Sequence, residues 1–273
     1  MKFSVLMSIY KNEKVDFFIR CMESIWDEQT TKPAEITLVI DGPLYDELYQ
    51  SIDMWREKLG DVFCVVPLEH NLGLGNALNI GLSHCKNELI ARMDTDDIAL
   101  PSRFEKQLAV FENKNIDVCG SWVSEFIDVE QNIISYRKVP EERNEIELFL
   151  KSNNPFNHPS VMYKKSSVIK AGNYQKMLWF EDYSLWARMK HKSALFYNIQ
   201  EPLVNMRAGY EQLERRRGLQ YALSEIKLQK SLLSLGIISY REYCRNVCVR
   251  FCVRLAPKAV VKLAYKLIRN RKL

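Results

Sequence analysis

The sequence turns from apolar to acidic at Leu89-Ile90-Ala91-Arg92-Met93-Asp94-Thr95-Asp96-Asp97, where three carboxylates fall within four positions. If residues 89–93 form a buried strand, Asp94 and Asp96 project to the same side of the strand end. Carboxylates held that close repel each other unless a cation lies between them. Two interpretations follow: an oxygen-ligand site for a hard divalent ion such as Mn²⁺ or Mg²⁺, or a solvated acidic turn that caps the helix expected near Pro101.

Upstream of this stretch, the chain alternates between strand and helix patterns in the way that a parallel α/β sheet requires. Helices with apolar residues at every third or fourth position separate the expected strands, which are residues 3–9, 36–40, 62–67 and 88–93. Ligands bind at the carboxyl edge of such sheets, so the sequence predicts one site there. The strand-end segments that would form it are residues 10–13, 41, 71–76 and 94–97.

Downstream of about residue 115 the alternation ends and the pattern becomes mixed. Two longer strands, at residues 118–128 and 133–139, are expected to form a hairpin. A charged helix and a turn-rich loop follow, and a further helix is expected to open near Glu181. The remaining short strands are expected at residues 160–163, 194–198 and 203–207.

Length and composition are those of an ordinary globular protein. The 273 residues are 47% hydrophobic and 27% charged, and no run of about 18 apolar residues predicts a membrane span. The apolar start leads into Lys11-Asn12-Glu13-Lys14 and not into a small-residue cleavage site, so we expect a strand there and no signal peptide. Seven cysteines without a Cys-x-x-Cys pair favour reduced thiols in a cytosol over a disulfide framework.

The net charge of +5 is distributed unevenly along the chain. Residues 241–273 carry ten Lys or Arg and a single Glu, whereas the first 240 residues sum to −4. An amphipathic helix is expected on each side of Pro257, and cationic helices of this kind lie in the interface of anionic membranes. The alternative is a helix packed on the domain with a solvated basic face. Nucleic acid is not expected as a partner, because interleaved aromatics and a reading motif are absent.

A series of short motifs runs through the chain in order. They are Ser4–Tyr10, Ile40-Asp41-Gly42, Asn71–Leu82, Ala91–Asp97, Asn157–Met162, Gly172-Asn173-Tyr174 and Glu181–Met189. Together they resemble the family 2 inverting glycosyltransferases, and the resemblance covers roughly residues 3–210. It implies the GT-A fold, a Rossmann-like α/β fold with a mostly parallel sheet and a smaller mixed half on the acceptor side, followed here by C-terminal amphipathic helices.

The resemblance also implies how the chain divides. Residues 1–115 would form the half that binds the nucleotide sugar, and residues 116–210 the acceptor-binding and catalytic half of the same domain. Residues 211–273 would form a basic helical region that associates with the membrane through residues 241–273.

The activity implied is the metal-dependent, inverting transfer of a hexose, galactose or glucose, from a UDP-sugar. The acceptor would be a polyprenyl-diphosphate-linked sugar of O-antigen or capsular polysaccharide synthesis, which would place the enzyme peripherally on the cytoplasmic face of the inner membrane. The donor hexose, the acceptor sugar, the linkage and the oligomeric state stay open. An inactive nucleotide-sugar-binding module and a nucleotidyltransferase are the alternatives, although the latter class usually has glycine where residues 8–14 have none.

On the donor side, the resemblance implies that Asp96 holds Mn²⁺ or Mg²⁺, with Asp94 near the ribose and the metal shell. Asp41 would accept a hydrogen bond from the uracil ring. Asp97 stays open between the metal shell and a helix cap. The other nucleotide contacts are expected from Ser8, Tyr10, Glu13, Asn71, Gly73, Asn76 and Arg92. For the glycine-containing segment the alternative is a capped helix start, and for Arg92 it is an ion pair with the aspartates.

The chain departs from the family pattern at one diphosphate contact, because many members have Arg where this chain has Leu78. Arg92 or Arg103 would compensate for that absent contact. Arg207 resembles a position that reaches toward the pyrophosphate.

On the acceptor side, inversion requires a base on the face opposite the leaving group. By the resemblance that base is Asp182, with Glu181 as the second candidate, and the alternative is that both only cap the helix that starts there. His158, Trp186 and Arg188 are expected to contact the acceptor or the donor sugar. The alternatives are a loop hydrogen bond for His158 and a core position for Trp186.

Overall fold

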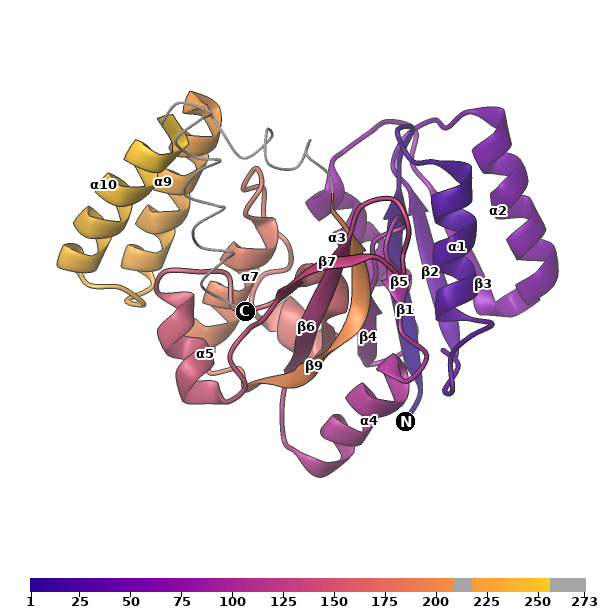
Figure 1. Cartoon of the computed structure of the whole chain (residues 1–273), viewed down its shortest axis with the longest axis horizontal. Helices are drawn as coiled ribbons and strands as arrows, with labels where there is room; N and C mark the ends of the chain where they lie inside the picture. The colour runs from indigo at the N-terminus through magenta and orange to yellow at the C-terminus, as the bar shows by residue number, and fades with distance from the viewer. Residues whose placement is uncertain (209–217, 256–273) are drawn as a thin grey trace. The chain divides into compact units, whose positions relative to one another are not determined.

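The computed structural model describes residues 1–208 and 218–255, except the side chains of residues 252 and 255 (Figure 1). These residues belong to two compact units. The sheet unit comprises residues 1–176 and 181–208, and the helical unit comprises residues 177–180 together with the chain from residue 209 onward.

The first four strands form the parallel part of one sheet. They are β1 (Phe3–Ile9), β2 (Glu35–Ile40), β3 (Phe63–Pro67) and β4 (Leu89–Arg92). They lie in the order β3-β2-β1-β4, and every neighbouring pair is parallel. The prediction of a parallel α/β half, with all four carboxyl ends at one edge, is therefore confirmed.

The second half continues the same sheet with mixed directions. Its strands are β5 (Ile98–Ala99), β6 (Val118–Phe126), β7 (Ile133–Arg137), β8 (Met162–Lys164) and β9 (Phe196–Arg207). β8 is antiparallel to β4 and β6, β6 is parallel to β9, and β7 pairs with β6 as the expected hairpin. The strands expected at 194–198 and 203–207 form one strand, because a register shift opposite Trp122 accommodates the residues between them.

The helices of the sheet unit connect these strands. They are α1 (Val15–Ile25), α2 (Asp46–Leu59), α3 (Leu74–His84), α4 (Arg103–Asn113), α5 (Arg143–Leu150), α6 (Lys165–Lys170) and α7 (Glu181–His191). Two 3-10 turns, η1 (Gly60–Val62) and η2 (His158–Ser160), complete the unit.

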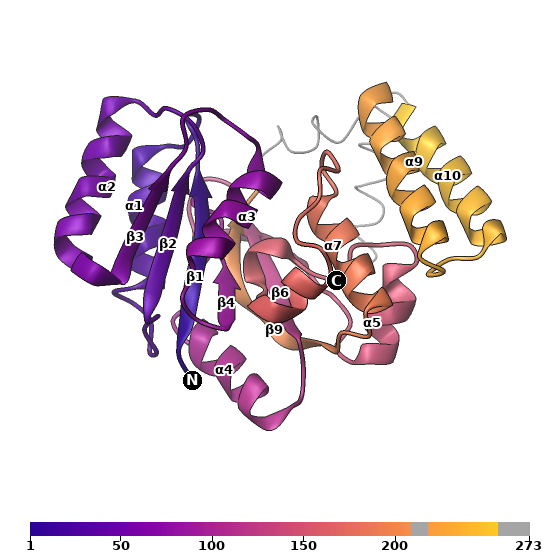
Figure 2. The ribbon, with the colours of Figure 1, turned by 180° about the vertical axis from the view of Figure 1, so that it is seen from behind.

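The sheet separates two layers of helices, because successive residues of a strand face opposite sides. Phe3, Val5 and Met7 of β1 belong to the core shared with α1, α2 and α4. On the other face, α3 lies so close that a Cβ at Gly81 would come within 2.5 Å of Leu6 Cδ1. The two views show α1 and α3 on opposite sides of β1 and β2 (Figures 1 and 2).

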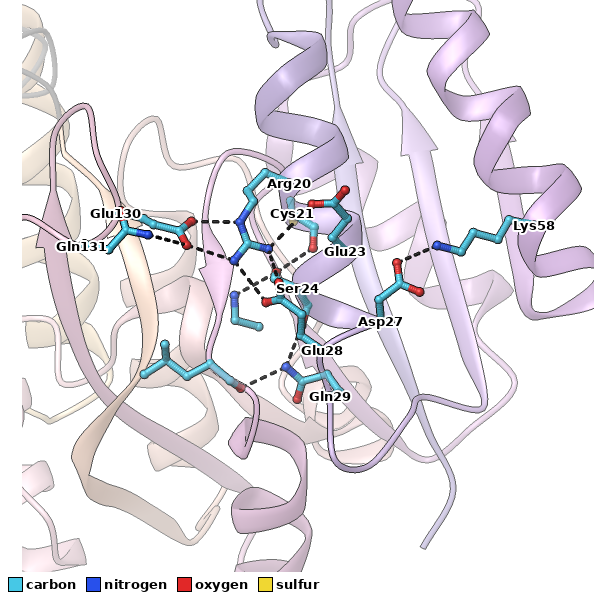
Figure 3. Close-up of polar contacts among 12 residues, drawn as sticks. Arg20, Cys21, Glu23, Ser24, Asp27, Glu28, Gln29, Lys58, Glu130 and Gln131 are labelled. Carbon is cyan, nitrogen blue, oxygen red and sulfur yellow. Dashed lines mark hydrogen bonds and ion pairs between the residues drawn. The ribbon is translucent and has the colours of Figure 1, made fainter.

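Arg20 connects α1 to the loop between β6 and β7 (Figure 3). Its Nε donates to Glu130 Oε2 at 2.9 Å, and its terminal nitrogens donate to the two oxygens of Glu28 at 3.0 and 3.1 Å. Nearby, Gln29 Nε2 donates to the carbonyl of Leu100 at 2.9 Å. These contacts join the parallel half of the sheet unit to its mixed half.

Among its described residues, the helical unit has the helices α9 (Leu219–Ser234) and α10 (Tyr240–Leu255). α10 begins with a capping box, in which Ser239 N donates to Glu242 Oε2 at 2.7 Å and Glu242 N to Ser239 Oγ at 3.3 Å. The helix expected after Pro257 lies outside the described residues. Within the described part of the chain, no helix combines the length and the apolar character needed to cross a membrane.

Candidate active site

An acidic turn follows β4 directly and contains Asp94, Asp96 and Asp97. One carboxylate oxygen from each of the three lies within 4.8 Å of the others. Burial, then the Asp94 and Glu13 carboxylates, raise the pKa of Asp96 to about 7. Burial, then Asp96 and Asp94, also raise the pKa of Asp97. Burial and mutual repulsion therefore disfavour the ionised carboxylates of this turn, and a bound cation would relieve that repulsion.

The donor set of this turn fits a hard divalent ion. Three carboxylates offer oxygen ligands only, which Mg²⁺ and Mn²⁺ prefer. Asp97 does not cap a helix, because α4 starts at Arg103 with Ser102 at its N-cap position. Instead, Asp97 Oδ1 accepts the backbone N–H of Arg207 at 2.8 Å, and its Oδ2 is buried without a hydrogen-bond partner. A buried carboxylate oxygen without a hydrogen-bond partner, next to two further carboxylates, is suited to bind a metal ion.

The loop after β1 reaches the acidic turn through Glu13. Thr95 Oγ1 donates to Glu13 Oε2, and Lys14 N donates to Glu13 Oε1 at 2.9 Å. Burial raises the pKa of Glu13 despite these two donors. On the same loop Tyr10 is exposed and Ser8 is half-buried. Glu13 thus lies at the acidic turn, and the exposed Tyr10 ring is free to meet a ligand.

Asp41 follows β2 and organises the neighbouring loop. Its carboxylate accepts the backbone N–H groups of Leu72 at 2.7 Å and Gly73 at 3.1 Å. Asn71 Nδ2 donates to the carbonyl of Asp41 at 3.0 Å. Gly73 has a φ of 83°, a left-handed conformation that favours glycine. The loop that leads into α3 is therefore ordered by Asp41, whose oxygens each keep a further lone pair for a ligand.

Asn76 and Leu78 both lie on α3 but differ in exposure. Asn76 is exposed and donates to the carbonyl of Leu72 at 2.9 Å, whereas Leu78 is fully buried. Leu78, which stands where many members of the resembled family have Arg, is thus a core residue in this chain.

Arg92, the last residue of β4, is buried at 1% exposure. Its Nη2 donates to Asp94 Oδ1, while Nε and Nη1 are buried without a partner. Although burial lowers the pKa of Arg92, the Asp94 carboxylate outweighs this and raises it. Arg92 therefore makes the ion pair with an aspartate and still has two donor nitrogens without a partner.

The structure places Arg103 beneath the turn and not beside it. The residue is fully buried, and Nη2 donates to the Arg92 carbonyl at 2.6 Å and Nε to Gln107 Oε1 at 3.2 Å. Burial lowers its pKa to about 9. Arg103 holds the backbone under the turn, so the diphosphate contact expected of it has no support in this arrangement.

Arg207, at the end of β9, lies against the same turn from the other side. Its Nε donates to the Asp96 carbonyl at 3.2 Å. The guanidinium lies 3.6 Å from the ring centre of Phe17 and 4.6 Å from that of Phe126. Arg207 therefore combines its backbone contact to Asp97 with a position next to the acidic turn, consistent with the expected diphosphate contact.

The candidate base stands at the start of α7. Asp182 Oδ2 accepts Asn154 Nδ2 at 2.6 Å, and its Oδ1 accepts the backbone N–H of Tyr183 at 2.7 Å. Burial raises the pKa of Asp182, while these two donors and the charges of Arg137 and Arg92 oppose the rise. Since Asp96 also senses the charge of Arg92, Asp182 and the acidic turn lie within electrostatic range of one guanidinium.

Glu181 packs against the donor side of the site. A Cβ at Gly75 of α3 would come within 3.2 Å of Glu181 Cγ and 3.6 Å of Tyr174 Cβ. The start of α7 therefore lies beside the start of α3, and glycine at position 75 permits the close approach.

His158 and Trp186 form part of an aromatic cluster behind Asp182. His158 Nε2 and the Tyr174 hydroxyl are 3.0 Å apart, and burial, then Arg92, lower the pKa of His158 well below its usual value. Trp186 is fully buried, with its ring centre 5.2 Å from that of Phe156 and 6.4 Å from that of Tyr163. His158 is thus a neutral hydrogen bonder near Arg92, and Trp186 occupies the core.

Arg188 lies farther along α7, where its Nη1 donates to the carbonyl of Ala171. Ala171 is the C-cap residue of α6, so this contact satisfies the end of a helix. Burial lowers the pKa of Arg188 to about 10. One nitrogen of Arg188 is therefore engaged by a helix end, whereas Nε and Nη2 are buried without a partner, and the expected sugar contact stays a prediction.

The sequence profile described as Glycosyl transferase family 2 matches residues 4–172. The chain belongs to this family. The amylovoran biosynthesis glycosyltransferase of Erwinia amylovora is 39% identical over 97% of this chain and 98% of its own length. The UDP-Gal:alpha-D-GlcNAc-diphosphoundecaprenol beta-1,3-galactosyltransferase of Escherichia coli is 38% identical over 99% of this chain and 97% of its own length.

Solved structures share the fold of this family 2 glycosyltransferase at low sequence identity. S. aureus TarS in complex with UDP-GlcNAc is similar with a TM-score of 0.68 at 15% identity, over 92% of this chain and 72% of that one. The mannosyltransferase PcManGT from Pyrobaculum calidifontis in complex with GDP-Man and Mn²⁺ gives 0.60 at 11% identity, over 98% and 80%. The expected GT-A fold and the expected transferase class are both confirmed.

Several site residues of the glycosyltransferase were not expected from sequence. Thr95 orients Glu13, Asn154 holds Asp182, and Tyr174 meets His158. Tyr174 is itself fixed by Asn79, whose side chain donates to its carbonyl at 2.7 Å and accepts its N–H at 2.8 Å. Tyr174 falls within a motif that carries the family resemblance, but Asn154 stands in a turn-rich loop where nothing distinguishes it from Asn153.

Proposed function

We propose that this glycosyltransferase transfers a hexose, galactose or glucose, from a UDP-sugar to a lipid-diphosphate-linked sugar, with inversion. The observation that carries the proposal is the two-sided arrangement of carboxylates. Asp94, Asp96 and Asp97 form one cluster of carboxylates. Asp182 is a separate carboxylate. Burial raises the pKa of Asp182 and of Asp96, and the Arg92 charge opposes the rise in both. One side suits a leaving group that gains negative charge, and the other suits removal of a proton.

A uridine donor is supported by the loops after β1 and β2. Asp41 orders the segment that starts at Asn71, and the exposed Tyr10 would stack on or frame the base. The Escherichia coli relative, which aligns with nearly the whole chain, is named for the donor UDP-Gal. The structural neighbour TarS was solved with UDP-GlcNAc. Galactose is the donor sugar that the relative's name favours.

The diphosphate would be bound at the acidic turn together with Mn²⁺ or Mg²⁺. Asp94 and Asp96 would hold the ion, and Asp97 would complete the cluster. When bound, such an ion supplies positive charge that offsets the charge of the departing diphosphate. The free Nε and Nη1 of Arg92 would donate to phosphate oxygens, and Arg207 would contribute a second positive charge.

Asp182 would act as the base for the acceptor hydroxyl. Its raised pKa brings the carboxylate closer to the pH at which a general base works best. Asn154 and the Tyr183 N–H hold the carboxylate in one orientation. Glu181, packed beside α3, remains the second candidate for this role.

The acceptor and its location follow from the same relative. Its name specifies GlcNAc linked to diphosphoundecaprenol, a lipid-linked sugar. We propose an acceptor of that class for this chain, used in O-antigen or capsular polysaccharide synthesis. The enzyme would then work peripherally at the cytoplasmic face of the inner membrane, with the basic residues 241–273 toward the lipid.

The test is a transfer assay with UDP-galactose, UDP-glucose and UDP-GlcNAc on a synthetic GlcNAc-diphosphate-lipid. We expect turnover with one UDP-hexose, loss of turnover in EDTA and recovery with Mn²⁺. Asp96→Ala should lower both transfer and Mn²⁺-dependent UDP affinity by about tenfold or more, because one ligand and one charge are lost. Turnover that is indifferent to EDTA would refute the metal site, and UDP-sugar binding without any turnover would favour a binding module.

A further inference from the structure

The seam between α9 and α10 is polar, although it is buried. Glu225 of α9 is 2% exposed and is paired with Arg250 and with Arg254, the latter at 2.9 Å from Arg254 Nε. One turn farther on, Asn246 Nδ2 donates to Gln229 Oε1 at 3.0 Å. The inward side of α10 thus buries an amide and two guanidinium groups with their partners on α9, next to the half-buried side chains of Val247 and Phe251.

The opposite face of α10 is exposed and largely apolar. Val249 is 59% exposed and Val253 is 46% exposed, and the free thiols of Cys244 and Cys248 are exposed as well. Cys244 and Cys248 lie one turn apart, as do Val249 and Val253, and the two pairs together cover about half of the helix circumference. Arg241 and Arg245 are exposed on the same face. α10 therefore exposes apolar side chains and arginines to solvent while it buries polar groups against α9.

The C-terminal region, residues 241–273, is strongly basic. Residues 241–273 contain Glu242 as their single acid, and that carboxylate caps the start of α10. Of the basic residues in that range, Arg250 and Arg254 are paired with Glu225. Arg241 and Arg245 are exposed, and Arg245 Nη2 also donates to Asn246 Oδ1 at 3.2 Å.

We infer that the outward face of α10 is the surface by which the protein lies on an anionic lipid bilayer, with the valines and cysteines in the acyl boundary and the arginines at the headgroups. Apolar side chains interleaved with cations have that surface as their complement. The buried seam determines the orientation, because it commits Asn246, Arg250 and Arg254 to α9. The biological reason for this contact, access to a lipid-linked acceptor, rests on the proposed function, whereas the contact itself is inferred from α10 alone.

The test is flotation of the full-length protein with vesicles of phosphatidylethanolamine and phosphatidylglycerol, compared with phosphatidylcholine alone. We expect the wild-type protein to float with the anionic vesicles and to be released by high salt. The double variant Val249→Glu, Val253→Glu should lose about tenfold or more of its partitioning. The matched control Leu219→Glu, Leu223→Glu places the same charges on exposed leucines of α9 and should float like the wild type.

Helical content by circular dichroism and UDP affinity should be the same in all three proteins. Unchanged flotation of the α10 variant would overturn the inference, as would equal losses in both variants. A change in oligomeric state by light scattering, without a change in flotation, would assign the face to a second copy instead. The vesicles contain neither donor nor acceptor, so flotation that behaves as expected without any sugar transfer would refute the proposed function alone.

Discussion

Arg92 is the residue through which the two sides of the site influence each other. Burial raises the pKa of Asp96, Asp97 and Asp182, and the Arg92 charge opposes the rise in all three. Sequence reasoning left Arg92 between a phosphate contact and an ion pair with the aspartates. The structure shows the pair with Asp94 and leaves Nε and Nη1 unpartnered, so the ion pair is seen and a phosphate contact from the other two nitrogens stays a prediction.

The pH dependence of transfer should report on Asp182 and its partner Asn154. Because the base must be ionised and burial raises its pKa, activity is expected to fall as the pH drops through a value above 3.8. Asn154→Ala removes a hydrogen bond that stabilises the charged form, so the acidic limb of kcat/KM should move to higher pH. Asn153→Ala, at the exposed neighbouring position, should leave the limb in place. An unmoved limb in Asn154→Ala would contradict the positioning role.

His158 predicts a pH-dependent contribution to stability. Its folded pKa is lowered well below 6.5 by burial and then by Arg92, so below pH 6.5 the unfolded chain takes up a proton that the folded chain refuses. The contribution of neutral His158 to the free energy of unfolding should therefore be complete above pH 6.5 and should be lost as the pH falls toward the folded pKa. In urea titrations at pH 7.5 and 5.5, His158→Gln should show a smaller loss on acidification than the wild type. His84→Gln, at an exposed position, should show the wild-type loss.

At the scale of elements, the first half of the sheet was predictable because each strand is a short apolar run followed by polar residues. The two-residue strand β5 was not, since Ile98 and Ala99 become a strand only by pairing with Asn205 and Val204. The single strand β9 was likewise divided in two, because the bulge that joins its parts is set by Trp122 on β6. Long-range pairing decides both cases, and a local pattern carries no information about it.

The packing of α3 on the sheet gives a prediction at the same scale. A Cβ at Gly81 would lie 2.5 Å from Leu6 Cδ1 and 2.6 Å from Val39 Cγ2. Gly81→Ala should therefore cost about 2–3 kcal/mol from overpacking, and after the roughly 1 kcal/mol that alanine gains in helix propensity a net destabilisation of about 1–2 kcal/mol should remain. Thermal unfolding checks this, with Ser83→Ala on the exposed face of α3 as the control. An unchanged or higher Tm for Gly81→Ala would show that β1 and α3 separate easily.

At the scale of the whole molecule, the order of motifs allowed the family to be expected, but it did not determine which side chains are open. Arg103 and Trp186 stand at suitable positions in sequence, yet both side chains are fully buried in the interior. The polarity of α10 also could not be foreseen, because the partner of Arg250 and Arg254 is a glutamate on another helix. Periodicity reveals an apolar face and says nothing of what the opposite face meets.

We propose that donor binding and proton removal are divided between the acidic turn and Asp182, which come from the two halves of the sheet unit. The Asp182→Asn variant separates the two roles when it is assayed for transfer and for UDP affinity in Mn²⁺ at one pH. We expect a fall in kcat of about 10²–10⁴ with UDP affinity within about twofold of the wild type, because the amide keeps the shape and loses the base. Retention of most of the transfer activity would contradict it.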